Sequence, residues 1–315
     1  MNSCRPPVFC RRYRRSALAI FVSLSIPAWL VGCGDGDRSV ADETRLVEQW
    51  RAKRFAGLTG EDGWLTLAGL YWLHEGENRF GRAAGNAVIL DHPALQDVSG
   101  VFTLRDGQVR FTAAADSNIT SRNQPVTQID LQTDASGDPT ILQTGSLRFY
   151  AIQRAGKFGV RVRDIDSPAR NAFHGLQYFP IDMHWRIRAH FEPYVPSKRV
   201  PIVNILGMVD AMESPGALVF DKDGKTWRLD TILESPGDSE LFVMFTDTTG
   251  GRETYGAGRY LYVAKPVNDI VWLDFNQAYN PPCAFTEFAT CPLPPRQNRL
   301  PLAITAGEKK YTEQP

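Results

Sequence analysis

Apolar residues recur at steps of three and four between residues 42 and 58, with charged residues between them. Leu46, Trp50 and Leu58 mark the apolar side, so the spacing predicts an amphipathic helix over 42–58 with Asp42 as its N-cap. Such a helix would pack on the body of the protein or, beside a lipid anchor, lie on a membrane surface.

From residue 59 onward, short runs of β-branched and aromatic residues alternate with glycine and Asn/Asp turns. Three hairpins are predicted, with turns at Asp106-Gly107, Ala155-Gly156 and Asp223-Gly224. Further strands are indicated by ELFVMFTD, GRYLYVAK and DIVWLDFN. Because the connections are short, we expect a mainly β protein, an antiparallel β sandwich or partly closed barrel, over 59–315. The polar stretch 113–140 would be a loop excursion or a seam between two halves.

The first 32 residues follow a different pattern. Five arginines precede the apolar run from Ala17 to Gly32, and no acidic residue occurs before Asp35. This predicts an export signal peptide over 1–32, with an uncleaved membrane anchor as the alternative. The run ends in LVGC, which resembles a bacterial lipobox, so Cys33 would carry the lipid and 33–41 would form a flexible tether. We therefore expect an exported protein held in the cell envelope by a lipid anchor. With Gly34 after the cysteine, it would lie on the outer membrane facing the periplasm if the source has two membranes.

Removal of the signal changes the charge and the cysteine count. The full chain has 35 basic and 35 acidic residues; without the five arginines of the signal, 30 remain against 35, a formal charge of −5. This balance argues against a nucleic-acid partner, whose phosphates require neutralising cations. Cys283 and Cys291 are the two cysteines left after Cys33, and an even pair in an exported protein predicts a disulfide. A thiolate nucleophile or a metal-binding pair is the alternative.

Arginines alternate with apolar residues in two predicted strands. Arg161 and Arg163 share one face of GVRVRD, and Arg186 and Arg188 share one face of WRIRAHF. If these strands pair, their arginines form a basic strip suited to carboxylate, phosphate or acidic polysaccharide. The alternative is a solvated outer face crossed by ion pairs. The histidines are scattered and no nucleotide-binding fingerprint is complete, so no metal and no cofactor are expected.

Several longer strings resemble a bacterial family known only as domain of unknown function 1684. They are GWLTLAGLYWL, GENRFG, RVRD, WRIRAHF, FTDTTGGRETYGAGRYL, DFNQAYNPPCAF, CPLPPRQNRL and AGEK, which together span residues 63 to 309. The resemblance implies secreted or lipid-anchored members. It supplies no reaction.

Polar residues gather in the carboxyl-terminal block of that resemblance. Carboxylates, phenols and arginines on loops around a β scaffold are typical of a ligand site. The candidate ligand-binding residues are Tyr255, Arg259, Asp274, Asn276, Tyr279, Asn280, Asn298 and Arg299. The candidate catalytic carboxylates are Asp247, Glu253 and Asp274. Turn caps and buried ion pairs would account for the same residues.

The sequence thus favours a lipid-anchored envelope protein that binds a small polar or acidic ligand through its C-terminal half. A cofactor-independent hydrolase using Asp247, Glu253 and Asp274 is the second hypothesis. A structural or assembly lipoprotein without a pocket is the third.

Overall fold

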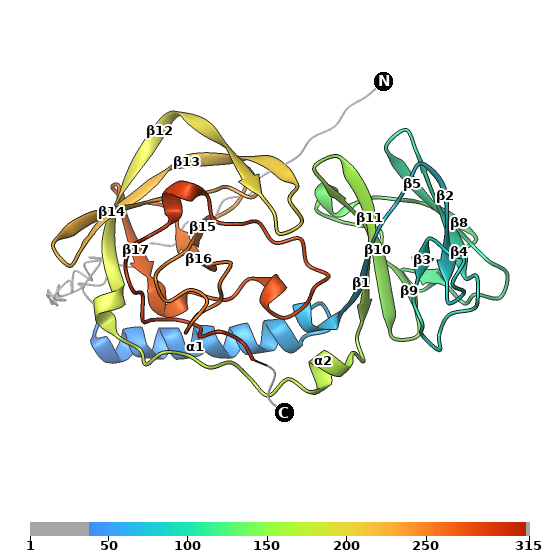
Figure 1. Cartoon of the computed structure of the whole chain (residues 1–315), viewed down its shortest axis with the longest axis horizontal. Helices are drawn as coiled ribbons and strands as arrows, with labels where there is room; N and C mark the ends of the chain where they lie inside the picture. The colour runs from blue at the N-terminus through green and yellow to red at the C-terminus, as the bar shows by residue number, and fades with distance from the viewer. Residues whose placement is uncertain (1–37, 313–315) are drawn as a thin grey trace, which may run out of the picture. The chain divides into compact units, whose positions relative to one another are not determined.

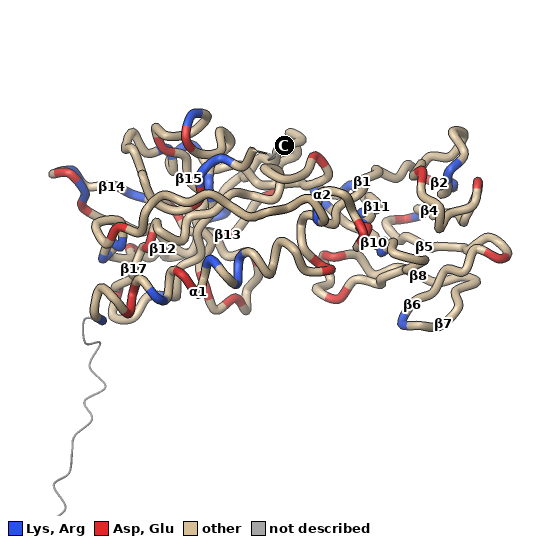
Figure 2. The backbone as a smooth tube through the Cα atoms, turned by 90° about the horizontal axis from the view of Figure 1, so that it is seen from below, with Lys and Arg blue, Asp and Glu red and all other residues tan. Residues whose placement is uncertain are grey.

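The computed structural model describes residues 38–312, and these belong to one compact unit from Ser39 onward. The longest helix, α1 (Val40–Thr59), confirms the predicted helix but begins two residues earlier. Its N-cap is Ser39, whose side chain accepts from the backbone N of Asp42, so the prediction of Asp42 as cap is wrong. Figure 1 shows α1 running beneath the carboxyl-terminal strands. In Figure 2 basic and acidic positions both occur along it.

Two antiparallel sheets form the amino-terminal part of the β structure. The first has the order β3-β2-β4-β5-β8, with strands Val88–Ile89, Gly76–Gly81, Gly100–Arg105, Gln108–Ala113 and Gln128–Leu131; only β2 and β3 are parallel. The second has the order β1-β11-β10-β9-β6-β7, with strands Leu67–Trp72, Lys157–Asp164, Leu147–Arg154, Leu142–Thr144, Thr120–Ser121 and Gln124–Pro125. Four fully buried phenylalanines from both sheets form their common core: Phe80, Phe102, Phe111 and Phe149.

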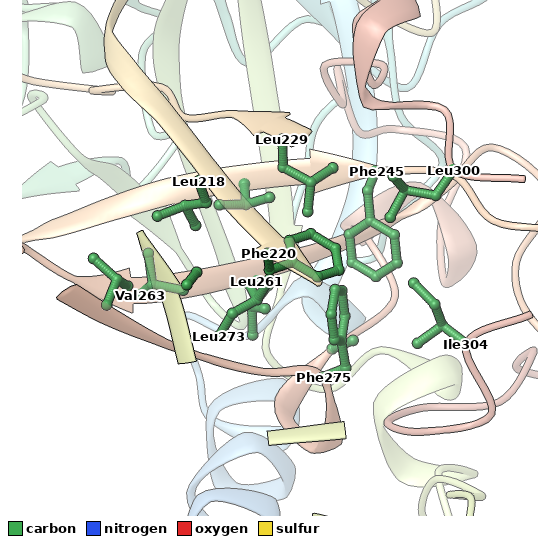
Figure 3. Close-up of a cluster of buried hydrophobic side chains, with 14 of the residues drawn as sticks. Leu218, Phe220, Leu229, Phe245, Leu261, Val263, Leu273, Phe275, Leu300 and Ile304 are labelled. Atoms are coloured by element: carbon green, nitrogen blue, oxygen red, sulfur yellow. The ribbon is translucent and has the colours of Figure 1, made fainter. Parts of the chain in front are cut away.

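The carboxyl-terminal part contributes six strands to the β structure, which includes a half-barrel. A four-stranded sheet has the order β14-β13-β12-β17, with strands Lys225–Asp230, Val209–Lys222, Arg186–Val203 and Ile270–Asp274. A two-stranded ribbon pairs β15 (Glu240–Phe245) with β16 (Arg259–Ala264). Their shared core is centred on Phe275, which contacts Phe220, Phe245 and Trp185 (Figure 3).

The β15–β16 ribbon is buried on both faces. Its odd-numbered side chains, such as Leu241 and Leu261, join the core of Figure 3. Its even-numbered side chains, such as Phe242 and Tyr260, join a second cluster with Cys291. Since successive side chains of a strand point to opposite faces, the ribbon separates the core from whatever lies on its other side.

The predicted β architecture is confirmed, and the turn residues explain much of its register. The three predicted hairpins are β4–β5, β10–β11 and β13–β14. Each turn pairs a non-glycine residue at positive φ with a glycine at positive φ, as in Asp106 (51°) and Gly107 (74°). The stretch 113–140 is not one loop, because it contains β6, β7, β8 and a short helix.

Shorter helical segments connect the strands. They are α2 (Pro168–Asn171) and the single-turn 3-10 helices η1 (Trp64–Thr66), η2 (Asp134–Ser136), η3 (Met183–Trp185), η4 (Phe275–Gln277), η5 (Pro282–Ala284) and η6 (Arg296–Asn298). Within residues 38–312, none of the helices has the length and apolar character needed to span a membrane. The predicted signal peptide, lipidation at Cys33 and most of the tether lie outside the described residues.

Candidate functional site

The strongest ion pair of the predicted site is structural. Arg259 and Asp247 lie 2.8 Å apart, and their side chains are 1% and 2% exposed. Asp247 also accepts from the backbone N and the hydroxyl of Thr249. Arg259 donates to the backbone oxygens of Ala306 and Ile304. Because both charges are enclosed and bonded to the chain itself, this pair holds the C-terminal segment and is not presented to a ligand.

Asp274 and Asn276 also stabilise local structure. Asp274 caps η4 by accepting from the backbone N of Asn276 at 3.0 Å and from Gln277 Nε2 at 3.1 Å. Asn276 donates to the backbone oxygen of Asp182 and accepts from its backbone N. The contacts of Asp274 therefore agree with the alternative interpretation, in which this residue caps a turn.

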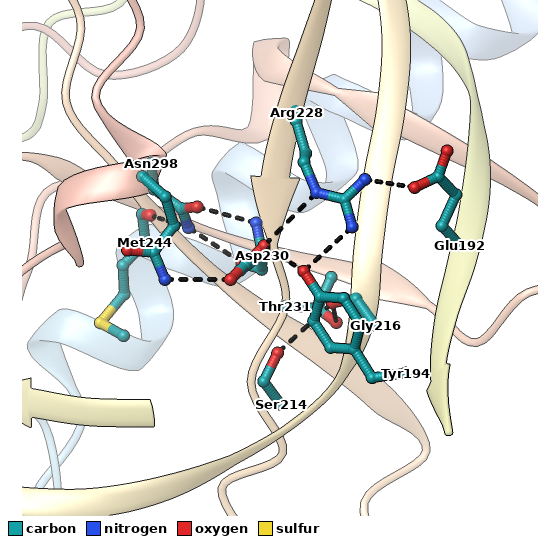
Figure 4. A network of polar contacts seen from close by, with 10 residues as sticks. Glu192, Tyr194, Ser214, Gly216, Arg228, Asp230, Thr231, Met244 and Asn298 are labelled. Carbon is teal, nitrogen blue, oxygen red and sulfur yellow. Dashed lines mark hydrogen bonds and ion pairs between the residues drawn. The ribbon is translucent and has the colours of Figure 1, made fainter. Parts of the chain in front are cut away.

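Asn298 is a buried connector between strands (Figure 4). Its Oδ1 accepts from the backbone N of Asp230, and its Nδ2 donates to the backbone oxygens of Asp230 and Met244. Glu253 and Arg299 are exposed, and Tyr255 donates to the backbone oxygen of Cys283 at 3.1 Å. The three candidate catalytic carboxylates are thus not brought together around a cavity.

A buried carboxylate that the sequence did not single out joins α1 to the C-terminal segment. Glu308 is fully buried and accepts from Arg54 Nε at 2.9 Å and from the backbone N of Asn280 at 2.7 Å. Burial raises the pKa of Glu308, and the facing Arg54 opposes that shift. This contact fixes one side of α1 beside Tyr279, whose ring lies 4.6 Å from the Arg54 guanidinium carbon. The predicted packing of the helix on the body is confirmed.

Cys283 and Cys291 are free thiols in the structure, so the predicted disulfide is not formed. The backbone N of Cys283 donates to Sγ of Cys291 at 3.0 Å, and η5 holds Cys283 in that position. The pair therefore contributes to the shape of the loop through a hydrogen bond and not through a covalent bond.

The basic strip does not form, because its two strands do not pair. β11 pairs with β1 and β10, whereas β12 pairs with β13 and β17. Arg186 forms an ion pair with Glu43 of α1 at 2.9 Å, and Arg188 is exposed. Arg163 is buried and donates to the backbone oxygens of Asp62 and Gly63. The alternative of a solvated face is also wrong for Arg161 and Arg163, which are 3% and 9% exposed.

A cavity among the described residues has a volume of about 840 Å³. It lies between α1, the ends of β10 and β11, the β12–β13 hairpin, the β15–β16 ribbon and the 277–292 segment. This volume is within the usual range of small-molecule sites. Of the predicted ligand residues, Tyr279 and Arg161 line it.

Arg161 is a buried cation without an anionic partner. Among the described residues no carboxylate lies within 4.0 Å of its guanidinium, and its buried Nε has no hydrogen-bond partner. Its Nη2 donates to Thr290 Oγ1 at 3.2 Å. Burial lowers the pKa of Arg161, and the neighbouring Arg154 adds to that effect. Arg154 differs, since it forms a two-point ion pair with Asp134.

Sequence reasoning missed most of the aromatic wall of this cavity, which consists of Trp50, Trp64, Phe242, Tyr260 and Tyr262 beside Tyr279. The alternation in RYLYVA would have placed both tyrosines opposite Leu261 and Val263. The approach of Thr290 to Arg161 had no sequence signal, because 129 positions separate them.

Comparison with known proteins adds a family match for part of the chain. Residues 171–309 match the family model described as "Protein of unknown function (DUF1684)". No curated protein matches. Among solved structures, an uncharacterized protein from gene locus rrnAC0354 of Haloarcula marismortui is 33% identical over 44% of this chain and 78% of its own, with a TM-score of 0.38. A structure from a study of phosphothreonine-dependent FHA domain interactions is 15% identical over 30% of this chain and 92% of its own, with a TM-score of 0.22. By the first of these matches, residues 171–309 belong to the family of unknown function DUF1684.

Proposed function

We propose that this protein binds a small anionic ligand in the cavity between α1 and the β15–β16 ribbon. The observation that carries the proposal is Arg161, a guanidinium that is 3% exposed, lines the cavity and lacks a carboxylate within 4.0 Å among the described residues. A buried charge without a partner lowers the stability of the folded protein. Such a charge is retained where a ligand supplies the opposite charge.

The surroundings of Arg161 support an anion and not a structural partner. Thr290 Oγ1 accepts from both Arg161 and Arg154, so one neutral hydroxyl lies between two cations. Lys53 adds a third cation on the exposed side of α1. Arg161 and Arg154 would donate charge-assisted hydrogen bonds to a carboxylate or phosphate oxygen beside Thr290. The neutral hydroxyl of Thr290 is a weaker acceptor than such an oxygen.

Arg161→Met should separate a binding role from a structural one. In the absence of ligand, the free energy of unfolding should stay the same or rise by about 1 kcal/mol. Methionine fills a similar volume without the unpaired buried charge. Binding of acetate should weaken at least tenfold, the effect of losing about 1.5–3 kcal/mol of charged hydrogen bonding. Urea denaturation and calorimetric titration measure the two quantities.

Arg163→Met is the matched control, two residues along the same strand face. Arg163 donates to Asp62 O, Gly63 O and Thr66 Oγ1, so its loss leaves buried acceptors unsatisfied and should destabilise the protein by about 1–3 kcal/mol. If Arg161→Met destabilises as much as Arg163→Met and leaves anion binding unchanged, Arg161 is structural and the proposal is wrong.

We also propose that the protein is exported and anchored in the cell envelope through lipid on Cys33. The support is the basic segment, the short apolar run and the LVGC string of the sequence. Radiolabelled palmitate should enter the wild type and be absent from Cys33→Ala, measured by fluorography of the protein isolated from cells. Equal labelling of both would contradict the lipid anchor.

A further inference from the structure

Two tyrosine hydroxyls of the aromatic wall are bonded within the protein. Tyr262 OH donates to Glu234 Oε2 at 2.6 Å, and Tyr260 OH donates to the backbone oxygen of Pro292 at 2.5 Å. With its hydroxyl engaged, Tyr262, a side chain 40% exposed, presents its ring face to the cavity. An aromatic face of this kind packs against apolar C–H groups or against another ring.

The ring of Tyr262 is held in place by its neighbours. Its centroid lies 5.0 Å from that of Phe242 and 6.1 Å from that of Tyr279, to which it is nearly parallel at 16°. The guanidinium of Arg54 packs over the ring of Tyr279. Because the platform is formed before a ligand arrives, stacking on it requires little ordering of side chains.

Charge in and around the cavity limits the negative charge that a ligand can carry. The cavity is lined by the cations Lys53, Arg54, Arg154 and Arg161 and by the carboxylates Asp210, Glu234 and Glu240. Glu308 and Asp134 neutralise Arg54 and Arg154, so five carboxylates face four cations. A phosphate dianion or a polyanion would be repelled by this excess, whereas one carboxylate can pair with Arg161.

The rim carboxylates also indicate the rest of the ligand. Asp210 and Glu240 line the cavity, and among the described residues neither side chain has a hydrogen-bond or ion-pair partner. Ionised carboxylates only accept hydrogen bonds, so they match a ligand that carries several hydroxyl donors. An aromatic acid would use the platform but would leave these acceptors without donors.

On the basis of the proposed anion-binding function, we propose that the ligand is an acidic sugar of the uronic acid type. Its carboxylate pairs with Arg161 beside Thr290, the C–H face of its pyranose ring stacks on Tyr262, and its hydroxyls donate to Asp210 and Glu240. A cavity of about 840 Å³ holds more than one such ring, so the end of an acidic saccharide chain also fits.

Calorimetric titration with glucuronate, glucose, acetate, benzoate and inorganic phosphate tests this assignment. Glucuronate should bind at least tenfold more tightly than each of the other four, because it alone supplies a single charge, a saturated ring and hydroxyls. Tyr262→Leu should weaken glucuronate binding about five- to tenfold and leave acetate binding unchanged, consistent with aromatic packing of about 0.5–1.5 kcal/mol. Arg161→Met should weaken both.

Trp272→Leu is the matched control, since Trp272 is 42% exposed on β17 and does not line the cavity. It should leave glucuronate binding unchanged. If acetate binds through Arg161 but glucuronate binds no tighter than acetate or benzoate, the sugar assignment is wrong and anion binding stands. If no anion depends on Arg161, both proposals are wrong.

Discussion

Asp247→Asn should lower the free energy of unfolding by about 3–5 kcal/mol, the usual effect of removing one partner from a buried ion pair. The substitution preserves the shape of the side chain but leaves Arg259, at 1% exposure, without its ion-pair partner. Its remaining acceptors are the backbone oxygens of residues 304, 306 and 308, which already accept from it. Urea denaturation followed by far-ultraviolet circular dichroism measures the loss.

Two further variants make this test specific. Asp223→Asn changes the same functional group at an exposed hairpin turn and should alter stability by no more than about 0.5 kcal/mol. Combining Asp247→Leu with Arg259→Met removes both charges, and it should recover part of the stability lost in Asp247→Asn. A loss below about 1 kcal/mol for Asp247→Asn would show that solvent reaches Arg259 and that the pair is not the anchor of the C-terminal segment.

Phe275→Ala should destabilise the protein by about 3–5 kcal/mol, because it opens a cavity at the centre of the half-barrel core. Phe275 is fully buried, and its ring lies 5.3 Å from that of Phe245 and 5.9 Å from those of Phe220 and Trp185. These four rings come from separate elements, so the surrounding structure cannot close the gap by moving one side chain. Figure 3 shows the rings of Phe220, Phe245 and Phe275. The denaturation midpoint should fall with little change in the denaturant slope.

Phe55→Ala provides the comparison at a surface position. Phe55 is 43% exposed on α1 and contacts Phe173 at a centroid distance of 5.6 Å. Its removal should lower stability by about 1 kcal/mol or less, since alanine is a good helix former and no enclosed cavity results. Equal losses for Phe55→Ala and Phe275→Ala would contradict the placement of Phe275 in the core.

Local patterns in the sequence predicted the helix and strands of this fold better than they predicted which strands lie side by side. Asp106-Gly107 and the other turns were predictable because positive φ has a strong residue preference. The pairing of β12 with β17 was not, since alternation shows which side chains share a face and not which strand lies beside them. The basic strip depended on that missing information.

The same limit applies to the candidate site. Asp274, Asn298 and Arg259 were predicted site residues because they are polar. In the structure Asp274 and Asn298 satisfy buried backbone groups, and Arg259 pairs with Asp247. Arg161 was among the predicted anion-binding residues, but the reason for its interest is different. It faces a cavity formed by segments that are distant in the sequence, and it has no carboxylate partner among the described residues.

The two faces of β16 divide the strand between the core and the cavity. Leu261 and Val263 belong to the core, whereas Tyr260 and Tyr262 border the cavity. Tyr260 is 4% exposed and Tyr262 is 40% exposed, so position 262 is the less constrained of the two. The strand can therefore carry a different cavity-facing side chain at position 262 without a change in the packing of Leu261 and Val263.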